Sequence, residues 1–480
     1  MKIVLFALNS SFVHTNLAIR CLKDYIDKNS LKKHDVLLVE RNNKDKFDEI
    51  LHSLHECNAD LYGFSCYIFN IDEIIQIAKS LKKLLPNSKI VFGGPEVSYD
   101  ADELMKINPF IDNVICNEAE QSFLDFVNND DNKKIIVSQP FSKFENQDFL
   151  YDDEFKISGN IAYYESCRGC PYNCSYCLSS TTKGIRSKTS QKTLDDLYEF
   201  EKFGSKIKII KFVDRTFNFD IERAKIILNG LTDIKYSKIY HMEMRPELFD
   251  DEMFEILARF PKDKLQLEIG IQSTNKKTLE AIDRPSDINK AISNMKRIRI
   301  SNNIKIHCDL IAGLPFDNIN TIRQSYNDVF FACDELQLGF LKMLKGSKIR
   351  KQADKFNYIY NDKAPYEVLS NDCISYEMMF KLKRIAALTQ RFKNSMHFKK
   401  SCEYIVSFNI SPFDYFYGFN EYIGEHISHL SQHEAFRKFF EYSSFNIKNS
   451  ISVDEWDKFI KILCEEYKQC LNKNAPEYFC

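Results

Sequence analysis

The chain has 480 residues, of which 44% are hydrophobic and 28% charged, a composition typical of soluble globular proteins. Its 66 basic and 68 acidic residues give a formal net charge of -2 at pH 7. This balance gives no reason to expect a nucleic-acid partner or an anionic membrane, and the length predicts two to four domains.

The apolar stretches of the chain are short. None approaches the roughly 18 residues that a transmembrane helix needs. Ile3–Leu8 follows Lys2 but is too short for the apolar region of a signal peptide, and no small-residue cleavage site comes after it. We therefore expect a cytoplasmic protein without a membrane partner, whose 15 cysteines are mostly reduced thiols.

Residues 1–127 alternate short apolar runs with amphipathic stretches, and this alternation predicts a doubly wound, Rossmann-like parallel sheet. The clearest helical pattern is Ile71–Leu85, for which Asn70 and Glu73 are a start signal. Ligands bind such sheets beyond the carboxyl ends of the strands, so polar residues and glycines there are candidate contacts. The expected strands are Lys2–Leu8, Asp35–Val39, Leu61–Ser65, Lys89–Phe92 and Asn113–Cys116.

A polar and acidic stretch, residues 128–158, is expected to be a linker or a peripheral crossing segment. A second alternating series follows over residues 159–345, and its six strand–helix units predict a partial (β/α)6 barrel of the TIM type. The expected strands are Ile161–Glu165, Ile207–Val213, Ile239–Glu243, Leu265–Ile269, Lys305–Ile311 and Glu335–Leu338, with helices that include Asp251–Arg259 and Lys276–Ile282.

The strand signal fades beyond residue 346. Tyr366–Phe392 has a helical pattern, and the tail is rich in Phe, Tyr and His. We therefore predict a mostly helical C-terminal domain over residues 346–480. The fold class expected for the whole chain is α/β.

A dense group of cysteines, Cys170-Pro-Tyr-Asn-Cys174-Ser-Tyr-Cys177, directly follows the first strand of the second series. Three thiolates on one short loop can hold three irons of a [4Fe–4S] cube and leave the fourth iron open for a substrate. Pro171 and Asn173 favour a turn that wraps a compact cluster. Cys170, Cys174 and Cys177 are therefore the candidate metal ligands.

Two other metal sites could use the same cysteines. A structural zinc site could add Cys167, but four ligands so close in sequence would tie no separate segments together, and no histidine occurs between His55 and His241. A ferredoxin cluster would space its cysteines by two, two and three residues, whereas here the order is two, three and two. Cys167 is expected to be a spare thiol.

The three-then-two cysteine spacing, with the aromatic Tyr176 before the last cysteine, resembles the signature of the radical S-adenosylmethionine (SAM) superfamily. Four later strand ends resemble the cobalamin-dependent branch of that superfamily. They are Val213–Asn218, Glu243–Pro246, Glu268–Ser273 and Asp309–Pro315. The resemblance implies a [4Fe–4S] cluster on three cysteines and SAM contacts from Tyr176, Asp214, Glu243, Glu268, Ser273 and the backbone around Gly313.

The N-terminal 127 residues resemble the cobalamin (B12)-binding domain of the same branch. There is no Asp-x-His-x-x-Gly motif, which supplies a lower cobalt ligand in other corrinoid proteins, so His14 is either a cobalt ligand or a locally bonded loop histidine. Asn117 stands where Gly is commoner in the branch. The implied cobalamin contacts are Asn9, Ser10, His14, Ser65, Tyr67, Gly93, Gly94, Glu96 and Glu118, with the glycine pair allowing a close backbone approach.

By resemblance, the chain is an anaerobic radical enzyme that cleaves SAM reductively to a 5′-deoxyadenosyl radical, while the protein orients the reactants and excludes water. Methylation of an unreactive carbon or phosphorus is the expected reaction. The alternative is rearrangement or oxidative cyclisation without methyl transfer.

The sequence does not identify the substrate, a small molecule or a peptide, and a low-potential electron donor of the flavodoxin or ferredoxin type is expected. A non-catalytic corrinoid- or metal-binding sensor is the alternative of another class, but no basic helix supports an output on DNA. Ser370 and Tyr376–Arg384 are similar to an uncharacterised C-terminal domain often found on such proteins.

Overall fold

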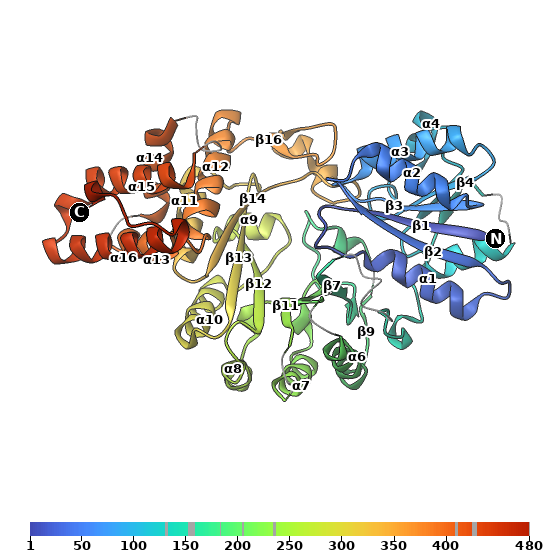
Figure 1. The fold of residues 1–480 in the computed structure, drawn as a ribbon, viewed down its shortest axis with the longest axis horizontal. Coiled ribbons are helices and arrows are strands. Elements are labelled where there is room, and N and C mark those ends of the chain that lie inside the picture. The colour runs from blue at the N-terminus through green and yellow to red at the C-terminus, as the bar shows by residue number, and fades with distance from the viewer. Residues whose placement is uncertain are drawn as a thin grey trace. The chain divides into compact units, whose positions relative to one another are not determined.

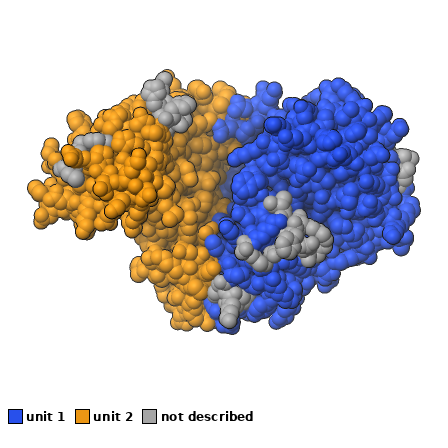
Figure 2. All heavy atoms as spheres, in the orientation of Figure 1, with its two compact units in different colours: residues 1–243, 343–351, 361–367 blue, residues 244–342, 352–360, 368–480 orange. Residues whose placement is uncertain are grey.

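The computed structural model describes residues 1–480 except 130–132, 152–158, 183, 204–205, 234–236, 409–410, 425–429 and 480. The chain divides into two compact units (Figure 2). The first comprises residues 1–243, 343–351 and 361–367, and the second comprises residues 244–342, 352–360 and 368–480. Two short segments from late in the chain therefore belong with the N-terminal half.

Six parallel strands form the N-terminal sheet, in the order β2-β1-β3-β4-β5-β6 (Figure 1). Helices α1 and α5 pack together on one face, and α2 and α3 pack together on the other. The predicted doubly wound, Rossmann-like sheet is confirmed, with all five expected strands present. The elements are β1 (Lys2–Asn9), α1 (Leu17–Asn29), β2 (Asp35–Asn42), α2 (Phe47–Cys57), β3 (Leu61–Ser65), α3 (Ile71–Leu84), β4 (Lys89–Gly93), α4 (Ala101–Ile107), β5 (Asn113–Cys116), α5 (Glu120–Asn129) and β6 (Ile135–Val137).

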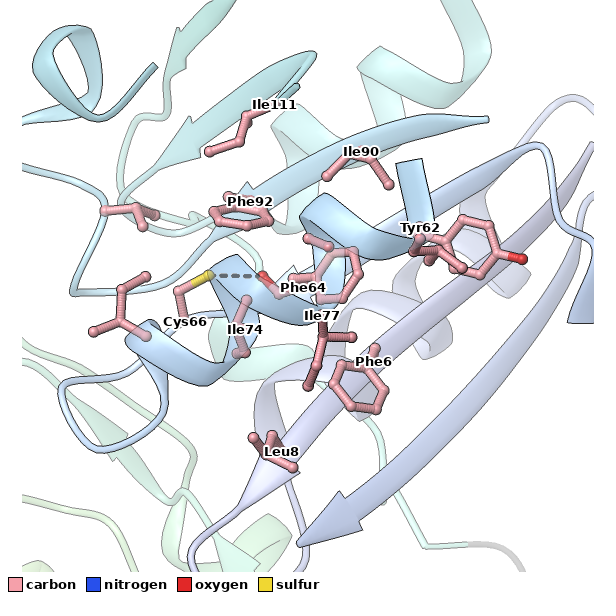
Figure 3. Close-up of a cluster of buried hydrophobic side chains, with 14 of the residues drawn as sticks. Phe6, Leu8, Tyr62, Phe64, Cys66, Ile74, Ile77, Ile90, Phe92 and Ile111 are labelled. Atoms are coloured by element: carbon pink, nitrogen blue, oxygen red, sulfur yellow. Dashed lines mark hydrogen bonds between the residues drawn. The ribbon is translucent and has the colours of Figure 1, made fainter. Parts of the chain in front are cut away.

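Strand β1 is buried on both faces, because successive side chains point to opposite sides of the sheet. Phe6 belongs to the core cluster beneath α2 and α3, whereas its neighbour Leu5 belongs to the cluster beneath α1 and α5. Figure 3 shows Phe6, Phe64 and Phe92 from three neighbouring strands beside Ile74 of α3. Their ring centroids are 5.6 Å apart for Phe6 and Phe64 and 5.5 Å apart for Phe64 and Phe92. This two-sided burial explains the continuous apolar runs in the sequence.

The sixth strand arises from the segment 128–158 that was expected to be a linker. Ile135–Val137 (β6) pairs in parallel with β5, and its residues are half-buried or exposed. Three such residues carry too weak an apolar pattern to predict a strand. Residues 130–132 and 152–158 of the same segment lie outside the described residues.

The second series of strands forms a parallel sheet in sequence order, β7-β10-β11-β12-β13-β14. The first three strands belong to the first unit and the last three to the second. Buried and half-buried residues alternate along β12 and β13, as in the wall of a barrel. The predicted partial barrel is confirmed. Its elements are β7 (Ile161–Tyr164), α6 (Ser190–Lys202), β10 (Ile209–Phe212), α7 (Ile221–Thr232), β11 (Ile239–Glu243), α8 (Asp251–Ala258), β12 (Leu265–Gln272), α9 (Lys276–Ala281), α10 (Ile288–Ser301), β13 (Lys305–Ala312), α11 (Ile319–Phe330) and β14 (Glu335–Phe340).

The C-terminal region is mostly helical, as predicted, but the expected helix Tyr366–Phe392 is correct only from Tyr376 onward. Before it, β16 (Val368–Ser370) pairs antiparallel with β15 (Ile359–Tyr360). The helices are α12 (Tyr376–Leu388), continued by a π-helical turn (Thr389–Lys393), α13 (Lys399–Val406), α14 (Pro412–Ile423), α15 (Gln432–Asn446) and α16 (Val453–Leu471). None of the helices within the described ranges combines the length and apolar character that a membrane crossing requires.

Candidate functional site

The three candidate ligand cysteines lie on one loop that begins just after β7. A short antiparallel pairing closes the base of this loop, between β8 (Cys167–Arg168) and β9 (Arg186–Ser187). Cys174 is buried, and Cys170 and Cys177 are half-buried. The backbone N–H of Cys177 donates to the carbonyl of Cys174 at 3.1 Å, which makes a turn. The thiol sulfur of Cys170 lies 3.8 Å from Oγ1 of Thr216.

The ionisation of the Cys170 thiol bears on how these cysteines would hold a metal. Burial, and to a smaller extent the neighbouring Cys177 and Cys174, raise the pKa of the Cys170 thiol, so a bound cation would be needed to hold it as a thiolate. Among the residues that the structure describes, no three His, Cys, Asp or Glu side chains are grouped to hold one metal ion. A cube takes each thiolate on a separate iron and does not require such convergence.

Cys167 lies in β8 and is buried. Burial raises the pKa of its thiol to about 12. Its expected status as a spare thiol stays a prediction, and its position in a paired strand separates it from the loop that carries the other three.

Asp214, expected to contact SAM, is buried at the end of β10 and binds the chain just before the cysteine loop. Its carboxylate accepts backbone N–H groups of Ser166 at 2.8 Å and Cys167 at 3.1 Å, and also the Ser166 hydroxyl. Burial raises its pKa to about 6 although these donors oppose the shift. Both carboxylate oxygens are therefore engaged by the protein, and a SAM contact from Asp214 stays a prediction.

The other expected SAM contacts fall in both units. In the first unit, Tyr176 is half-buried, and Glu243 at the end of β11 pairs with Arg215 at 3.5 Å. In the second unit, Glu268 lies in β12, and Ser273 directly follows that strand. Ser273 is buried, and its hydroxyl accepts the backbone N–H of Asn275 at 3.1 Å. Gly313 directly follows β13, in the second unit.

The nine expected cobalamin contacts all lie at or just beyond the carboxyl ends of strands β1, β3, β4 and β5 in one parallel sheet. The fold therefore brings them to one edge, as the sequence pattern predicted. Asn9 donates to the carbonyl of His14 at 3.1 Å and to Glu40 at 2.9 Å. Nδ1 of His14 lies 2.8 Å from the Tyr163 hydroxyl, and burial lowers the His14 pKa, which favours neutral imidazole.

The glycine pair at the end of β4 shows an asymmetry that leads to a prediction. Gly94 has a φ of +112°, and a Cβ there would lie 2.5 Å from the carbonyl oxygen of Cys66, whereas a Cβ on Gly93 would lie 3.6 Å from the carbonyl oxygen of Ile115. We expect Gly94→Ala to lower the free energy of unfolding by about 1–3 kcal/mol. Gly93→Ala is the matched control and is expected to be tolerated. Thermal unfolding of the purified variants tests this, and equal losses for both would contradict it.

Glu96, another expected cobalamin contact, is buried and holds a segment from late in the chain. Its carboxylate accepts the Tyr366 hydroxyl and pairs with Lys345 at 3.2 Å, while Lys345 also pairs with Asp100 at 2.7 Å. The same segment reaches the cysteine loop, where the backbone N–H of Ile349 donates to the carbonyl oxygen of Ser175 at 2.9 Å. Sequence reasoning missed Lys345 and Tyr366, because their partners lie about 250 residues away.

Glu118 links the N-terminal sheet to the hairpin that carries the cysteines. Its carboxylate accepts from Arg168 at 3.0 Å and from Arg186 at 2.7 Å, and Arg168 also pairs with Glu120 at 2.7 Å and Glu165 at 2.8 Å. Burial alone would raise the pKa of Glu118, but the two guanidinium groups outweigh it and lower that pKa. This buried ion-pair network joins the expected cobalamin edge to the base of the cysteine loop. Sequence reasoning missed both arginines.

Three family models match the chain. They are a B12 binding domain over residues 3–127, the radical SAM superfamily over residues 164–329, and a protein family of unknown function, DUF4080, over residues 354–477. These matches confirm the resemblance inferred from the motifs.

Curated relatives are distant. The chain is 26% identical over 224 residues to an uncharacterised methyltransferase of Pyrococcus horikoshii. This alignment covers 40% of this chain and 48% of the relative. It is 22% identical over 312 residues to the cobalamin-dependent radical SAM methyltransferase TokK of Streptomyces tokunonensis, covering 57% of this chain and 45% of TokK. The chain thus spans about half the length of these relatives.

Two solved structures share the fold. The cobalamin-dependent SAM radical enzyme OxsB aligns with a TM-score of 0.68 at 12% identity, covering 100% of this chain and 82% of OxsB. The radical SAM methyltransferase TsrM of Kitasatospora setae aligns with a TM-score of 0.58 at 15% identity, covering 78% and 81%. With this fold, the cysteine loop and the three domain matches together, the chain is a B12-binding-domain-containing radical SAM protein with a C-terminal domain of unknown function.

Proposed function

We propose that this protein is a cobalamin-dependent radical SAM enzyme that methylates an unreactive carbon or phosphorus centre. The observation that carries the proposal is the loop with Cys170, Cys174 and Cys177, whose base is bound to the B12-binding domain by the ion pairs of Glu118 with Arg168 and Arg186. Both the candidate cluster cysteines and the expected cobalamin contacts belong to the first unit, which supports chemistry that uses the two cofactors together. The distant curated relatives described as methyltransferases favour methyl transfer.

The residues present fit the implied cofactors. When bound, a [4Fe–4S] cluster would supply the electron that cleaves SAM to a 5′-deoxyadenosyl radical, and cobalamin would supply a transferable methyl group. Cys170, Cys174 and Cys177 would hold the cluster. Asp214 holds the backbone at the entry to their loop, so it would fix where that loop stands. A flavodoxin- or ferredoxin-type protein would deliver the electron, and the substrate would be a small molecule or a peptide.

Anaerobic reconstitution with iron, sulfide and cobalamin, followed by reduction in the presence of methyl-labelled SAM, tests the proposal. We expect both 5′-deoxyadenosine and S-adenosylhomocysteine, with label entering the bound cobalamin. Cleavage to 5′-deoxyadenosine without methyl loss would instead favour rearrangement or oxidative cyclisation. If neither product forms in a protein loaded with iron, the enzyme proposal fails and a non-catalytic sensor is favoured.

A further inference from the structure

The turn that follows β13 is held by residues from the C-terminal part of the chain. Gly313 has a φ of +92°, a conformation that glycine adopts without strain. Its carbonyl oxygen accepts two hydrogen bonds, from the Tyr358 hydroxyl at 2.8 Å and from Nδ2 of Asn371 at 3.0 Å. Both donors lie in the region that matches the family of unknown function.

The orientation of the Asn371 amide is determined by its own partners. Its Oδ1 accepts the backbone N–H groups of Cys373 at 2.9 Å and Ile374 at 3.0 Å. The amide oxygen is therefore committed to the turn before α12, and the NH2 group is left to donate to Gly313. Tyr358 is buried, so its hydroxyl is similarly constrained.

Apolar contacts from the same C-terminal segments enclose this turn. A Cβ at Gly313 would lie 3.2 Å from Cε of Met379 in α12 and 3.6 Å from Cγ1 of Val368 in β16. The ring of Phe316, three residues after Gly313, packs edge-on against that of Phe356, with centroids 5.8 Å apart. Polar and apolar contacts thus restrain the end of β13 from several elements that follow β14.

We propose that the C-terminal domain of unknown function completes the SAM site by positioning the Gly313 turn. Asn371 and Tyr358 are the positioning residues. They hold the Gly313 carbonyl, and hence the backbone that would contact the adenine, in one orientation. This inference rests on the proposed function, in which the backbone around Gly313 contacts SAM. On this view the C-terminal region is part of the radical SAM site and cannot be exchanged as a separate module.

The Asn371→Asp variant tests the proposal with little change in shape. A carboxylate can still accept the N–H groups of Cys373 and Ile374, but its second oxygen would face the Gly313 carbonyl and repel it. In the full-length, cluster-loaded and reduced protein, SAM titration is followed by the change in the electron paramagnetic resonance signal of the cluster. We expect the Kd for SAM to rise about tenfold, with iron content and Tm close to wild type.

Two further variants make the result decisive. Tyr358→Phe removes the other donor and is expected to weaken SAM binding to a smaller extent. Asn446→Asp is the matched control, because the Asn446 amide donates to the Tyr442 carbonyl at 2.9 Å at the end of α15. It is expected to leave SAM binding unchanged.

The outcomes separate cleanly. If Asn371→Asp and Tyr358→Phe bind SAM within about twofold of wild type, the positioning role is overturned. It is also overturned if both weaken SAM binding only together with loss of iron or of folding, since the contacts would then be merely structural. If the wild-type signal itself does not respond to SAM, the proposed function fails first.

Discussion

The Cys170→Ala variant is expected to lose the iron–sulfur cluster and all formation of 5′-deoxyadenosine. Cys170 is half-buried and is one of three thiols on a single loop. The nearby thiol that could replace it is that of Cys167. A cube held by two thiolates leaves a second iron without a protein ligand, and the cluster becomes labile. Iron and sulfide content, the visible absorption spectrum and 5′-deoxyadenosine measured after anaerobic reconstitution would show the loss. The same result is expected for Cys174→Ala and Cys177→Ala.

Cys167→Ala is the matched control, because it removes a thiol three residues away. Cys167 is buried in β8, which pairs with β9 at the base of the loop, and it lies outside the three-then-two cysteine spacing. We therefore expect this variant to assemble the cluster and to cleave SAM. Loss of iron from Cys167→Ala equal to that from Cys170→Ala would show that the ligand assignment is wrong.

Arg168→Met is expected to lower the free energy of unfolding by about 3–5 kcal/mol. Arg168 pairs with Glu118, Glu120 and Glu165, and its side chain is only 14% exposed. Methionine keeps much of the side-chain volume but takes the guanidinium away from Glu120 and Glu165, which have little access to water, while Glu118 keeps its pair with Arg186. Repulsion and lost solvation then oppose folding. Denaturant unfolding of the unloaded protein measures the change.

An exposed ion pair in the same unit provides the comparison. Lys23 and Asp27 on α1 are 2.6 Å apart, with side chains 35% and 44% exposed. We expect Lys23→Met to change the unfolding free energy by at most about 0.5 kcal/mol. Adding Glu120→Gln to Arg168→Met should recover part of the loss, because it removes a carboxylate that pairs with Arg168 in the wild-type protein. If Arg168→Met destabilises no more than Lys23→Met, the network does not bind the hairpin to the N-terminal sheet.

The network has a consequence for the proposed chemistry. Because Arg168 lies in β8 and Glu118 just beyond β5, breaking their contact would loosen the cysteine loop from the B12-binding domain. Cluster binding should therefore survive in Arg168→Met at temperatures where the variant stays folded, while transfer of the methyl label should fall. This separates the network from the ligand cysteines, whose loss removes the cluster itself.

Several parts of the fold were predictable because their signals are local. The strands of both sheets have apolar runs bounded by polar residues, and α3 has an apolar face at helical spacing. The prediction failed where the local signal was weak. β6 is only three residues long, and Asn371 ends the β15–β16 hairpin through contacts that no helical pattern reveals.

In the candidate site, too, local features were predictable from the sequence and long-range contacts were not. The candidate cysteine ligands were predictable because eight consecutive residues contain all three thiols. The protein contacts of Glu96, Glu118 and Asp214 were not predictable, because a carboxylate at a strand end has the same sequence signature whether or not it also contacts a distant side chain. In the folded protein these three carboxylates bind Lys345, Arg186 and Ser166 respectively.

The sequence by itself determined the cysteine loop, the two series of parallel strands and the edge at which the expected ligand contacts gather. These follow from spacing and period, which are properties of neighbouring residues. Only the tertiary structure decided which charged side chains pair with other side chains of the protein. It showed that Arg168 and Arg186 connect the cysteine hairpin to the N-terminal sheet. It also showed that Asn371 and Tyr358 hold the Gly313 turn. Those contacts join residues tens to hundreds of positions apart, and their strength depends on burial that exists only after folding.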